Sequence, residues 1–313
     1  MALLLEPGRR TGTGGPGHLR AEQVLGIQGA LRKRRMNPPG SPGASRAVLL
    51  CADDYALHPL VDEAVEQLAR AGRLSATSCM TASPRWQAAA ACLAPLRPQL
   101  AVGLHFDLTE SHGGAHAGAR ALGPLLLQAY ARQIPVAVLR AAWRTQLDAF
   151  ERAMRTPPDF IDGHQHVHQL PRARDALLAE LQARYAAHER PWVRSTAPAP
   201  GLWRDPKASI IALLGGWTAT RRWRRAGLAT NPGFGGVYGF DAPDAQAYGA
   251  RMATWLPRLP EGGLLMCHPA TDVVHGDAIG TQRPVEFAYL MSEAFGELLR
   301  RSGRHVQQGP FAP

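Results

Sequence analysis

Two adjacent carboxylates follow the first apolar stretch of strand length in this chain. Residues 47–52 are apolar apart from one sulfur, and Asp53 and Asp54 come directly after them. Two acids at the end of a buried strand repel each other, and a divalent cation would stabilise them. One acid could then bind the metal while the other accepts a proton. Taken alone, the pair also fits a helix cap followed by an exposed acid in a turn.

Histidines follow three later stretches of strand length. The stretch 100–106 contains His105 and leads into Asp107, and an extended strand would place both side chains on one face. The stretch that begins at Phe160 leads into three histidines, which alternation also places on a common face: His164, His166 and His168. A lone histidine is more often structural than a ligand, but three imidazoles at a spacing of two residues are hard to explain by packing. A fourth stretch, 263–267, ends in His268.

A parallel sheet would bring these side chains together. From Ala47 onward, apolar stretches of strand length alternate with segments of helical period, which indicates βα units around a parallel sheet. The expected strands are 47–52, 74–80, 100–106, 160–164, 192–195 and 263–267, and the expected helices are 60–71, 84–94, 137–155, 172–187, 243–256 and 285–301. The glycine-rich segment 231–239 is expected to be a loop, because it lacks a phosphate-binding pattern. Sites in such folds lie at the carboxyl ends of the strands.

One aspartate and two histidines would form a metal site with an open position for water, as in catalytic centres. Nitrogen ligands favour zinc over magnesium. A divalent metal in such a site supports hydrolysis of an amide or ester, with a carboxylate as base and an imidazole as acid.

Four motifs in this chain resemble those of the YdjC-like carbohydrate deacetylases, a family that includes chito-oligosaccharide deacetylases and hopanoid-biosynthesis-associated members. They span residues 52–55, 103–109, 162–168 and 266–269. The resemblance runs from about residue 48 to about residue 299. It implies an α/β fold, an irregular (β/α) barrel of the glycoside hydrolase/deacetylase type, and an enzyme that removes the acetyl group from an N-acetylated amino sugar.

The resemblance also implies roles for individual residues. Asp54, His105 and His164 would bind one divalent metal, for which the family also makes magnesium an option. Asp53 would be the general base and His268 the general acid. Further residues are expected beside the metal or at the substrate: His166, His168, Asp107, Arg194 and Arg283. Glu286 resembles a late glutamate of the family, although pairing with Arg283 across a helix start is an equal alternative.

Departures from the family pattern concern the rim of the site. The chain has Tyr55 and Ala56 where family members commonly have Phe-Gly, so we expect a larger polar ring and a less permissive backbone beside the metal. The segment 113–123 and the segment 231–239 are expected to shape a sugar pocket, with Trp203 or Tyr238 as a stacking surface.

Other functions remain open on the residues alone. The same ligands could serve a phosphoester or another amide, although phosphate chemistry usually employs several cations and Arg194 is the one candidate near the motifs. A catalytically silent carbohydrate-binding protein is a second alternative. A homodimer is left open, and a small carbohydrate is the expected partner.

The net charge of +10 is concentrated rather than spread. Seven basic and two acidic residues precede Met36, and the segment 1–46 is expected to be a disordered basic leader. One hypothesis is that translation starts at Met36, which would leave out residues 1–35. The deacetylase domain is expected over 47–303 and a flexible tail over 304–313. The arginines of 221–225 suit a solvated helix face, and no nucleic-acid motif accompanies them. Four cysteines without CxxC spacing, together with the lack of a signal peptide or membrane span, favour the cytoplasm.

Overall fold

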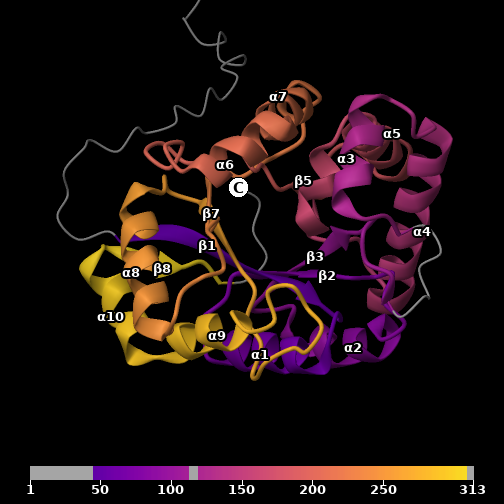
Figure 1. Cartoon of the computed structure of the whole chain (residues 1–313). Helices are drawn as coiled ribbons and strands as arrows, with labels where there is room; N and C mark the ends of the chain where they lie inside the picture. Colours follow the sequence, from indigo (N-terminus) through magenta and orange to yellow (C-terminus); the bar gives the residue numbers. More distant parts are fainter. Residues whose placement is uncertain (1–44, 113–118, 309–313) are drawn as a thin grey trace, which may run out of the picture. The chain divides into compact units, whose positions relative to one another are not determined.

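The computed structural model describes residues 45–112 and 119–308. Within these residues, eight parallel strands form one sheet in the order β5-β4-β3-β2-β1-β7-β6, and β8 pairs with β1 (Figure 1). The strands are β1 (Arg46–Tyr55), β2 (Ala76–Cys79), β3 (Ala101–Phe106), β4 (Phe160–Gly163), β5 (Trp192–Val193), β6 (Phe234–Gly235), β7 (Gly263–Cys267) and β8 (Arg304–Val306).

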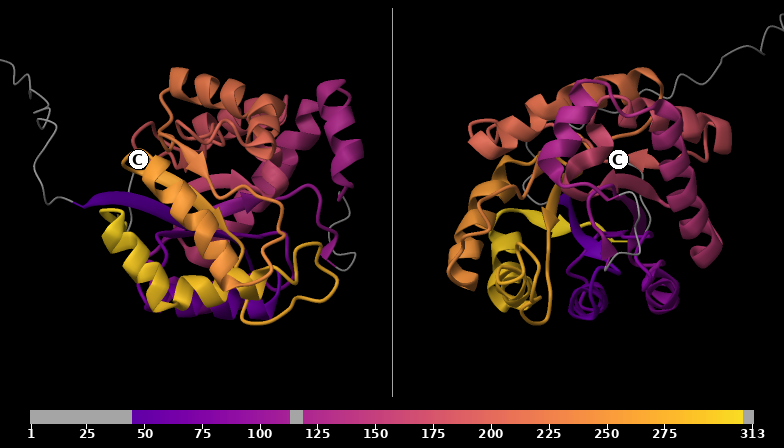
Figure 2. Two further views of the ribbon diagram at one scale, coloured as in Figure 1. Left: turned by 60° about the vertical axis from the view of Figure 1, so that its left-hand side comes forward. Right: turned by 45° about the vertical axis from the view of Figure 1, so that its right-hand side comes forward.

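The two ends of this sheet approach each other. An isolated parallel bridge joins Pro198, in the segment after β5, to Phe234 of β6. The sheet therefore curls toward closure, and the helices lie on its outer side (Figure 2). This arrangement confirms the expected α/β fold of the irregular (β/α) barrel type.

The helices follow the strands in the way that parallel βα units require. They are α1 (Pro59–Arg70), α2 (Trp86–Leu93), α3 (Leu122–Tyr130), α4 (Val136–Met154), α5 (Ala173–Arg184), α6 (Pro206–Ile211), α7 (Trp217–Arg225), α8 (Ala245–Trp255), α9 (Arg283–Met291) and α10 (Glu293–Arg301). A π-helical segment, η4 (Ala212–Gly216), joins α6 to α7, and a 3-10 segment, η3 (His164–Gln169), follows β4. None of these described helices is both long and apolar enough to span a membrane.

Alternation along each strand divides the core into two layers. In β1, Val48 and Leu50 pack with the helices, whereas Leu49 and Cys51 belong to a smaller cluster inside the curled sheet. The inner cluster also contains residues from the other long strands: Ala101, Phe160, Trp192, Leu264 and Met266. The next inward positions toward the carboxyl ends are polar: Asp53, His105, Asp162, Arg194 and His268. A layer of polar side chains therefore lies at the carboxyl ends of the strands, next to the inner apolar cluster.

Several expected elements differ from the structure. The helix expected over 285–301 is two helices, because Ser292 has extended backbone and its hydroxyl caps the N-terminus of α10. Residues 234–235 of the expected loop form β6, and residues 304–306 of the expected flexible tail form β8. The expected leader lies outside the described residues except for Ser45 and Arg46, and Arg46 already pairs with Arg304.

Candidate metal centre

Asp53 and Asp54 both face the inside of the sheet although they are neighbours in the chain. Regular alternation would place them on opposite faces. Asp54 instead has a φ of 69°, in the left-handed region, and the pairing of β1 with β2 shifts register between Ala52 and Tyr55. Such an irregularity re-aims a side chain at the end of a strand. The strained backbone at Asp54 therefore brings the second carboxylate into the same site.

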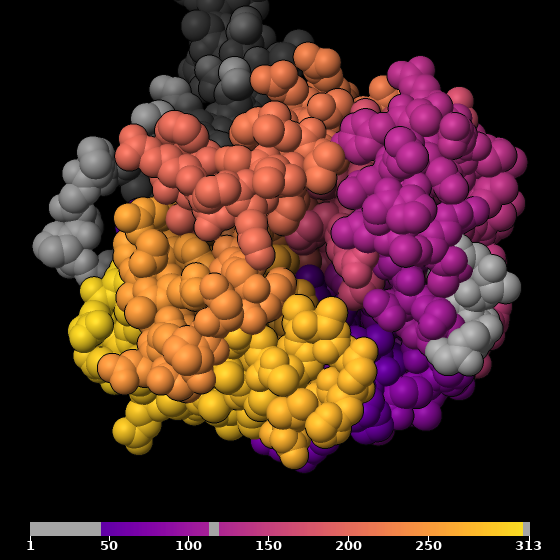
Figure 3. Space-filling model, in the orientation of Figure 1, coloured from indigo at the N-terminus to yellow at the C-terminus, as the bar shows by residue number. Residues whose placement is uncertain are grey.

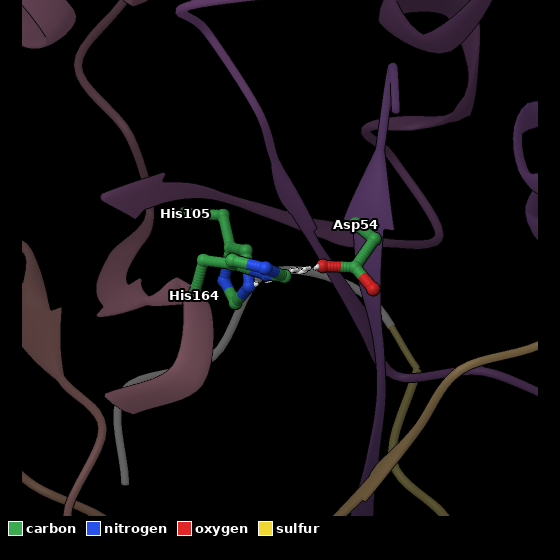
Figure 4. Close-up of side chains that lie close together, drawn as sticks. All are labelled: Asp54, His105 and His164. Atoms are coloured by element: carbon green, nitrogen blue, oxygen red, sulfur yellow. Dashed lines mark hydrogen bonds and ion pairs between the residues drawn. The ribbon is translucent and has the colours of Figure 1, made fainter. Parts of the chain in front are cut away.

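Asp54, His105 and His164 form the centre of the site, and their donor atoms all lie within 4.8 Å of one another (Figure 4). Oδ1 of Asp54 is 3.3 Å from Nε2 of His105 and 2.9 Å from Nδ1 of His164. The three side chains come from β1, from β3 and from the start of η3. The structure thus brings together the three residues that the sequence predicted as metal ligands.

The second nitrogen of each imidazole also faces an acid. Nδ1 of His105 lies 2.6 Å from Oδ1 of Asp162, and Nε2 of His164 lies 3.1 Å from Oε1 of Glu110. A neutral imidazole that donates to this outer acid turns a lone pair toward Asp54. Lone pairs and a carboxylate that converge on one point fit a cation, and outer acids that fix the imidazoles are typical of metal sites. The residues present therefore fit one divalent metal.

Electrostatics without the cation agree with this geometry. Burial would lower the pKa of both imidazoles, but Asp162 raises the pKa of His105 to about 9 and Asp54 raises that of His164 to about 10. Burial would raise the pKa of Asp54, yet Arg283 and His164 hold it well below its usual value. The site is therefore a concentration of negative charge that attracts protons when no metal neutralises it.

Asp53 is held by an arginine rather than by the imidazoles. Arg194 donates to both carboxylate oxygens of Asp53, over 2.7 Å and 2.6 Å, and is itself fully buried. Burial opposes ionisation of Asp53, but Arg194 holds the pKa of this carboxyl well below its usual value. Asp53 is thus a fixed carboxylate at neutral pH.

Asp162 contacts both His105 and Arg194, and it was not among the residues predicted for the site. One oxygen faces His105, and the other forms a 2.5 Å ion pair with Arg194. Asp162 is fully buried at the carboxyl end of β4. Phe160 points into the curled sheet, and period-two alternation places residue 162 on the same side. This pattern in the sequence could have identified Asp162 as a site residue.

Arg283 completes the contacts of Asp54. It donates to Oδ2 over 2.7 Å and also pairs with Asp277, so it leaves Oδ1 to the imidazoles. Glu286 is not paired with Arg283. It accepts hydrogen bonds from the backbone N–H of His268 over 2.6 Å and from the hydroxyl of Tyr238 over 2.5 Å.

The three histidines after Gly163 do not lie on one face of a strand. They lie in η3, where Gln165 and His166 have positive φ values of 49° and 62°. His164 points to Asp54, and His166 lines the cavity with its ring edge against Phe234. His168 is fully buried, stacks on Trp223 and contacts the carbonyl oxygen of Arg194. The prediction that the three histidines lie on one common face is therefore wrong, and His168 does not line the cavity.

Two further residues that were expected beside the metal or at the substrate, Asp107 and Arg194, lie outside the cavity lining. Asp107 is fully buried and holds a turn, since one of its oxygens accepts from the backbone N–H groups of Thr109 and Glu110. Arg194 is occupied by its acidic partners and does not line the cavity. Asp107 and Arg194 therefore act through their neighbours.

The expectation about residues 55 and 56 is half right. Ala56 has a φ of 74°, where a glycine would be less strained. The ring of Tyr55, however, is buried on the helix side, where its hydroxyl donates to the carbonyl of Ala89. This ring does not border the metal centre.

A cavity of about 670 Å³ opens over the centre. Asp53, Asp54, His164 and His268 all line it, and Nε2 of His268 lies 3.9 Å from Oδ2 of Asp53. Figure 3 shows a hollow between the segment that contains α6 and the loop before α9. The predicted base and acid thus face the same space as two of the predicted ligands, Asp54 and His164.

The two aromatic residues expected to stack on a sugar differ in position. Tyr238 lines the cavity, but it is 4% exposed and bonded to Glu286. Trp203 is 56% exposed and lies outside the cavity lining, so of the two alternatives Tyr238 is the one that borders the cavity. His116, in the segment expected to shape the pocket, lies outside the described residues.

Comparison with known proteins gives a family and a fold. Residues 47–301 match the family model described as YdjC-like protein. The crystal structure of an Enterococcus faecalis protein, whose description names cellobiose-phosphate cleavage, superposes with a TM-score of 0.61 at 17% identity. The match covers 84% of this chain and 97% of that one, so the two proteins share a fold.

Two curated relatives match part of the chain. A human protein named carbohydrate deacetylase is 28% identical over 148 residues, which are 44% of this chain and 45% of the relative. Chitooligosaccharide deacetylase of Proteus mirabilis is 30% identical over 126 residues, which are 39% of this chain and 49% of the relative. The chain thus spans just under half the length of these relatives in the matched segments.

Proposed function

This chain belongs to the YdjC-like family, and from that membership we propose that it is a metal-dependent deacetylase of an N-acetylated sugar. The names of the two curated relatives support the acetyl group and the carbohydrate. The chemistry of the site supports hydrolysis.

One observation carries the proposal. A fixed carboxylate and an imidazole, Asp53 and His268, line one cavity with two members of the candidate metal centre, Asp54 and His164, and His105 completes that centre beside them. A purely structural metal would not require Asp53 and His268. Their presence favours a catalytic site over a silent carbohydrate-binding protein.

Asp54, His105 and His164 would hold the metal ion. When bound there, a divalent metal would polarise the acetyl carbonyl and acidify a water molecule. Mixed oxygen and nitrogen donors favour zinc, and magnesium is the alternative. Arg283 and Asp162 would keep Asp54 and His105 in the orientation that this binding needs.

Asp53 would accept the proton of the attacking water. Arg194 grips its two oxygens, which fixes the orientation of the carboxylate and keeps it ionised. The same contact lowers its basicity, so proton transfer to Asp53 depends on a water that is already acidified. Asp53 would therefore act as a base toward a water acidified in this site, and it would be a weak base toward ordinary water.

His268 would protonate the amine that leaves the acetyl group. Its ring lies edge-on to Phe240 and is 12% exposed toward the cavity. Glu286 accepts a hydrogen bond from the backbone N–H of His268, which stabilises the backbone that carries the ring. General acid catalysis by such a group contributes on the order of 10² to 10⁴ in rate.

Arginines that could bind a phosphoryl group are already engaged at this site. Arg194 pairs with Asp53 and Asp162, and Arg283 pairs with Asp54 and Asp277. Phosphoryl transfer usually employs cations aimed at the reacting oxygens. The engagement of both guanidinium groups supports amide hydrolysis over phosphoester hydrolysis.

Acetate release tests the proposal. Metal-stripped protein resupplied with zinc, cobalt or magnesium is incubated with N,N'-diacetylchitobiose and a panel of other N-acetylated sugars. We expect release that depends on the metal, that falls on the order of 10² to 10⁴-fold in Asp53→Asn and His268→Ala, and that is lost in His105→Ala with loss of metal binding.

Asp159→Asn is the matched control. Asp159 pairs with Arg97 at the opposite end of β4 and does not line the cavity. Its substitution should leave acetate release unchanged. Full activity in Asp53→Asn would contradict the proposed base, and metal binding without turnover of any acetylated sugar would contradict the deacetylase function.

A further inference from the structure

The outward face of the segment from α6 to α7 is apolar at its centre. Ile210, Leu213 and Trp217 are 54%, 70% and 43% exposed. They lie close together in the chain, at the end of α6, in η4 and at the start of α7. Large apolar side chains that gather on a helical surface mark an interaction site more often than scattered ones do.

Cations flank this apolar centre. Residues 203–225 contain six basic residues and one acidic residue, Asp205. Lys207 precedes the apolar residues, Arg221 and Arg225 follow them, and all three are exposed. Neither of these two exposed arginines has an ion-pair partner within residues 45–112 and 119–308, whereas Arg222 pairs with Asp175. We call the outward side chains of Lys207, Ile210, Leu213, Trp217, Arg221 and Arg225 the α6–α7 face.

The α6–α7 face is continuous with the cavity. Lys207 and Ile210 belong both to this face and to the cavity lining. Figure 3 shows the segment that carries them at the border of the hollow. A surface that binds the α6–α7 face would therefore lie beside the entrance of the candidate site.

A second copy of the chain fits this face poorly. In a two-fold dimer the same patch meets itself, so Arg221 and Arg225 would face cations of the second copy, either Lys207 or their own counterparts. Like charges across an interface are unfavourable, and the segment offers Asp205 alone as an opposite charge. An anionic partner of low specificity suits the arrangement better.

We propose that the α6–α7 face docks on an anionic phospholipid surface. Helices that lie in a membrane interface combine exposed Leu, Ile and Trp with Lys and Arg that reach the headgroups. Trp217 and Leu213 would enter the boundary between headgroups and acyl chains, while Arg221 and Arg225 would pair with phosphates. The proposal concerns binding and does not depend on the proposed deacetylase activity.

Vesicle binding of the full chain tests the proposal. Binding is measured by co-sedimentation with vesicles of phosphatidylcholine alone and of phosphatidylcholine mixed with phosphatidylglycerol. We expect binding to the mixed vesicles that weakens as salt is added. Arg221→Gln with Arg225→Gln should weaken it by roughly 25-fold, about fivefold for each arginine. Leu213→Ser should weaken it roughly tenfold.

Two substitutions elsewhere provide matched controls. Leu127→Ser removes a leucine of α3 that is 71% exposed, and Arg152→Gln removes an exposed arginine of α4. Both variants should bind mixed vesicles as the unchanged chain does. Equal binding by the α6–α7 variants and the controls would overturn the proposal and assign the binding to another part of the chain. A second result would also overturn the proposal: no vesicle binding, together with a dimer in light scattering that Leu213→Ser dissociates.

Discussion

At the scale of single residues, two neighbouring acids of the same type acquire different properties from their partners. Arg194 fixes Asp53, whereas Asp54 faces two imidazoles and Arg283. The sequence indicated that the two acids would differ in role. Arg194 and Arg283 were expected beside the site, but the sequence could not assign each arginine to one acid, because these contacts span 141 and 229 residues of chain.

Substitution of Asp162 should weaken metal binding. The amide oxygen in Asp162→Asn could still accept a hydrogen bond from His105, but the substitution removes the charge that holds the imidazole and pairs with Arg194. Loss of such an outer partner typically lowers metal affinity 10- to 100-fold. Titration with zinc against a competing chelator measures the change, and Asp159→Asn is the control at the other end of β4. An unchanged affinity in Asp162→Asn would show that His105 needs no such support.

At the scale of elements, the strands that carry the site were predictable and the segment after β4 was not. Apolar stretches of strand length identified these strands, and period-two alternation predicted a common face for the histidines after Gly163. The same rule failed at η3, because Gly163 allows the chain to fold back: a Cβ at this position would lie 2.9 Å from the backbone nitrogen of His168. This contact joins residues five apart and leaves no periodic signal. The short α6 and α7 were missed because the glycines of η4 interrupt their helical pattern.

Burial of His168 should make the fold sensitive to mild acid. Desolvation holds the pKa of this imidazole well below its ordinary value of 6.5. Below pH 6.5 the unfolded chain therefore binds a proton that the folded chain does not, and the free energy of unfolding falls by up to about 1.4 kcal/mol per pH unit. We expect His168→Gln to have a shallower pH dependence between neutral pH and pH 5.

Denaturant unfolding at several pH values measures this slope. His188→Gln, which changes an exposed histidine after α5, should keep the slope of the unchanged chain. The slope is compared rather than the stability itself, because glutamine packs differently against Trp223. Identical slopes in His168→Gln and the unchanged chain would assign the acid sensitivity to other groups.

At the scale of the whole molecule, the candidate metal centre joins residues that are far apart in the sequence. Its three candidate ligands come from β1, β3 and η3, and they meet only when these elements are folded. A metal that binds the folded chain at a concentration of 100 times its Kd would stabilise it by about 2.7 kcal/mol. For a domain of this size we expect removal of the metal by a chelator to lower the Tm by roughly 5 to 10 °C.

Calorimetry with and without chelator measures this shift. Asp54→Asn is the informative variant, because it weakens the centre while the sheet retains its pairing. Its Tm should respond little to metal or chelator. A Tm of the unchanged chain that is indifferent to zinc, cobalt and magnesium would argue against a metal that binds at these residues.

The pairing of β1 determines when the site can form during synthesis. β2, which follows β1 closely in the sequence, pairs with one edge of β1, and β8 pairs with the start of that same edge. The other edge pairs with β7, where Val48 lies opposite Gly263. The strand that carries both acids therefore emerges from the ribosome long before β7 does. Pairings over such sequence distances are slow to form, and an open strand edge invites aggregation in the meantime. Chains released from the ribosome before β7 is made would thus leave unpaired the edge of β1 that leads to its acidic end.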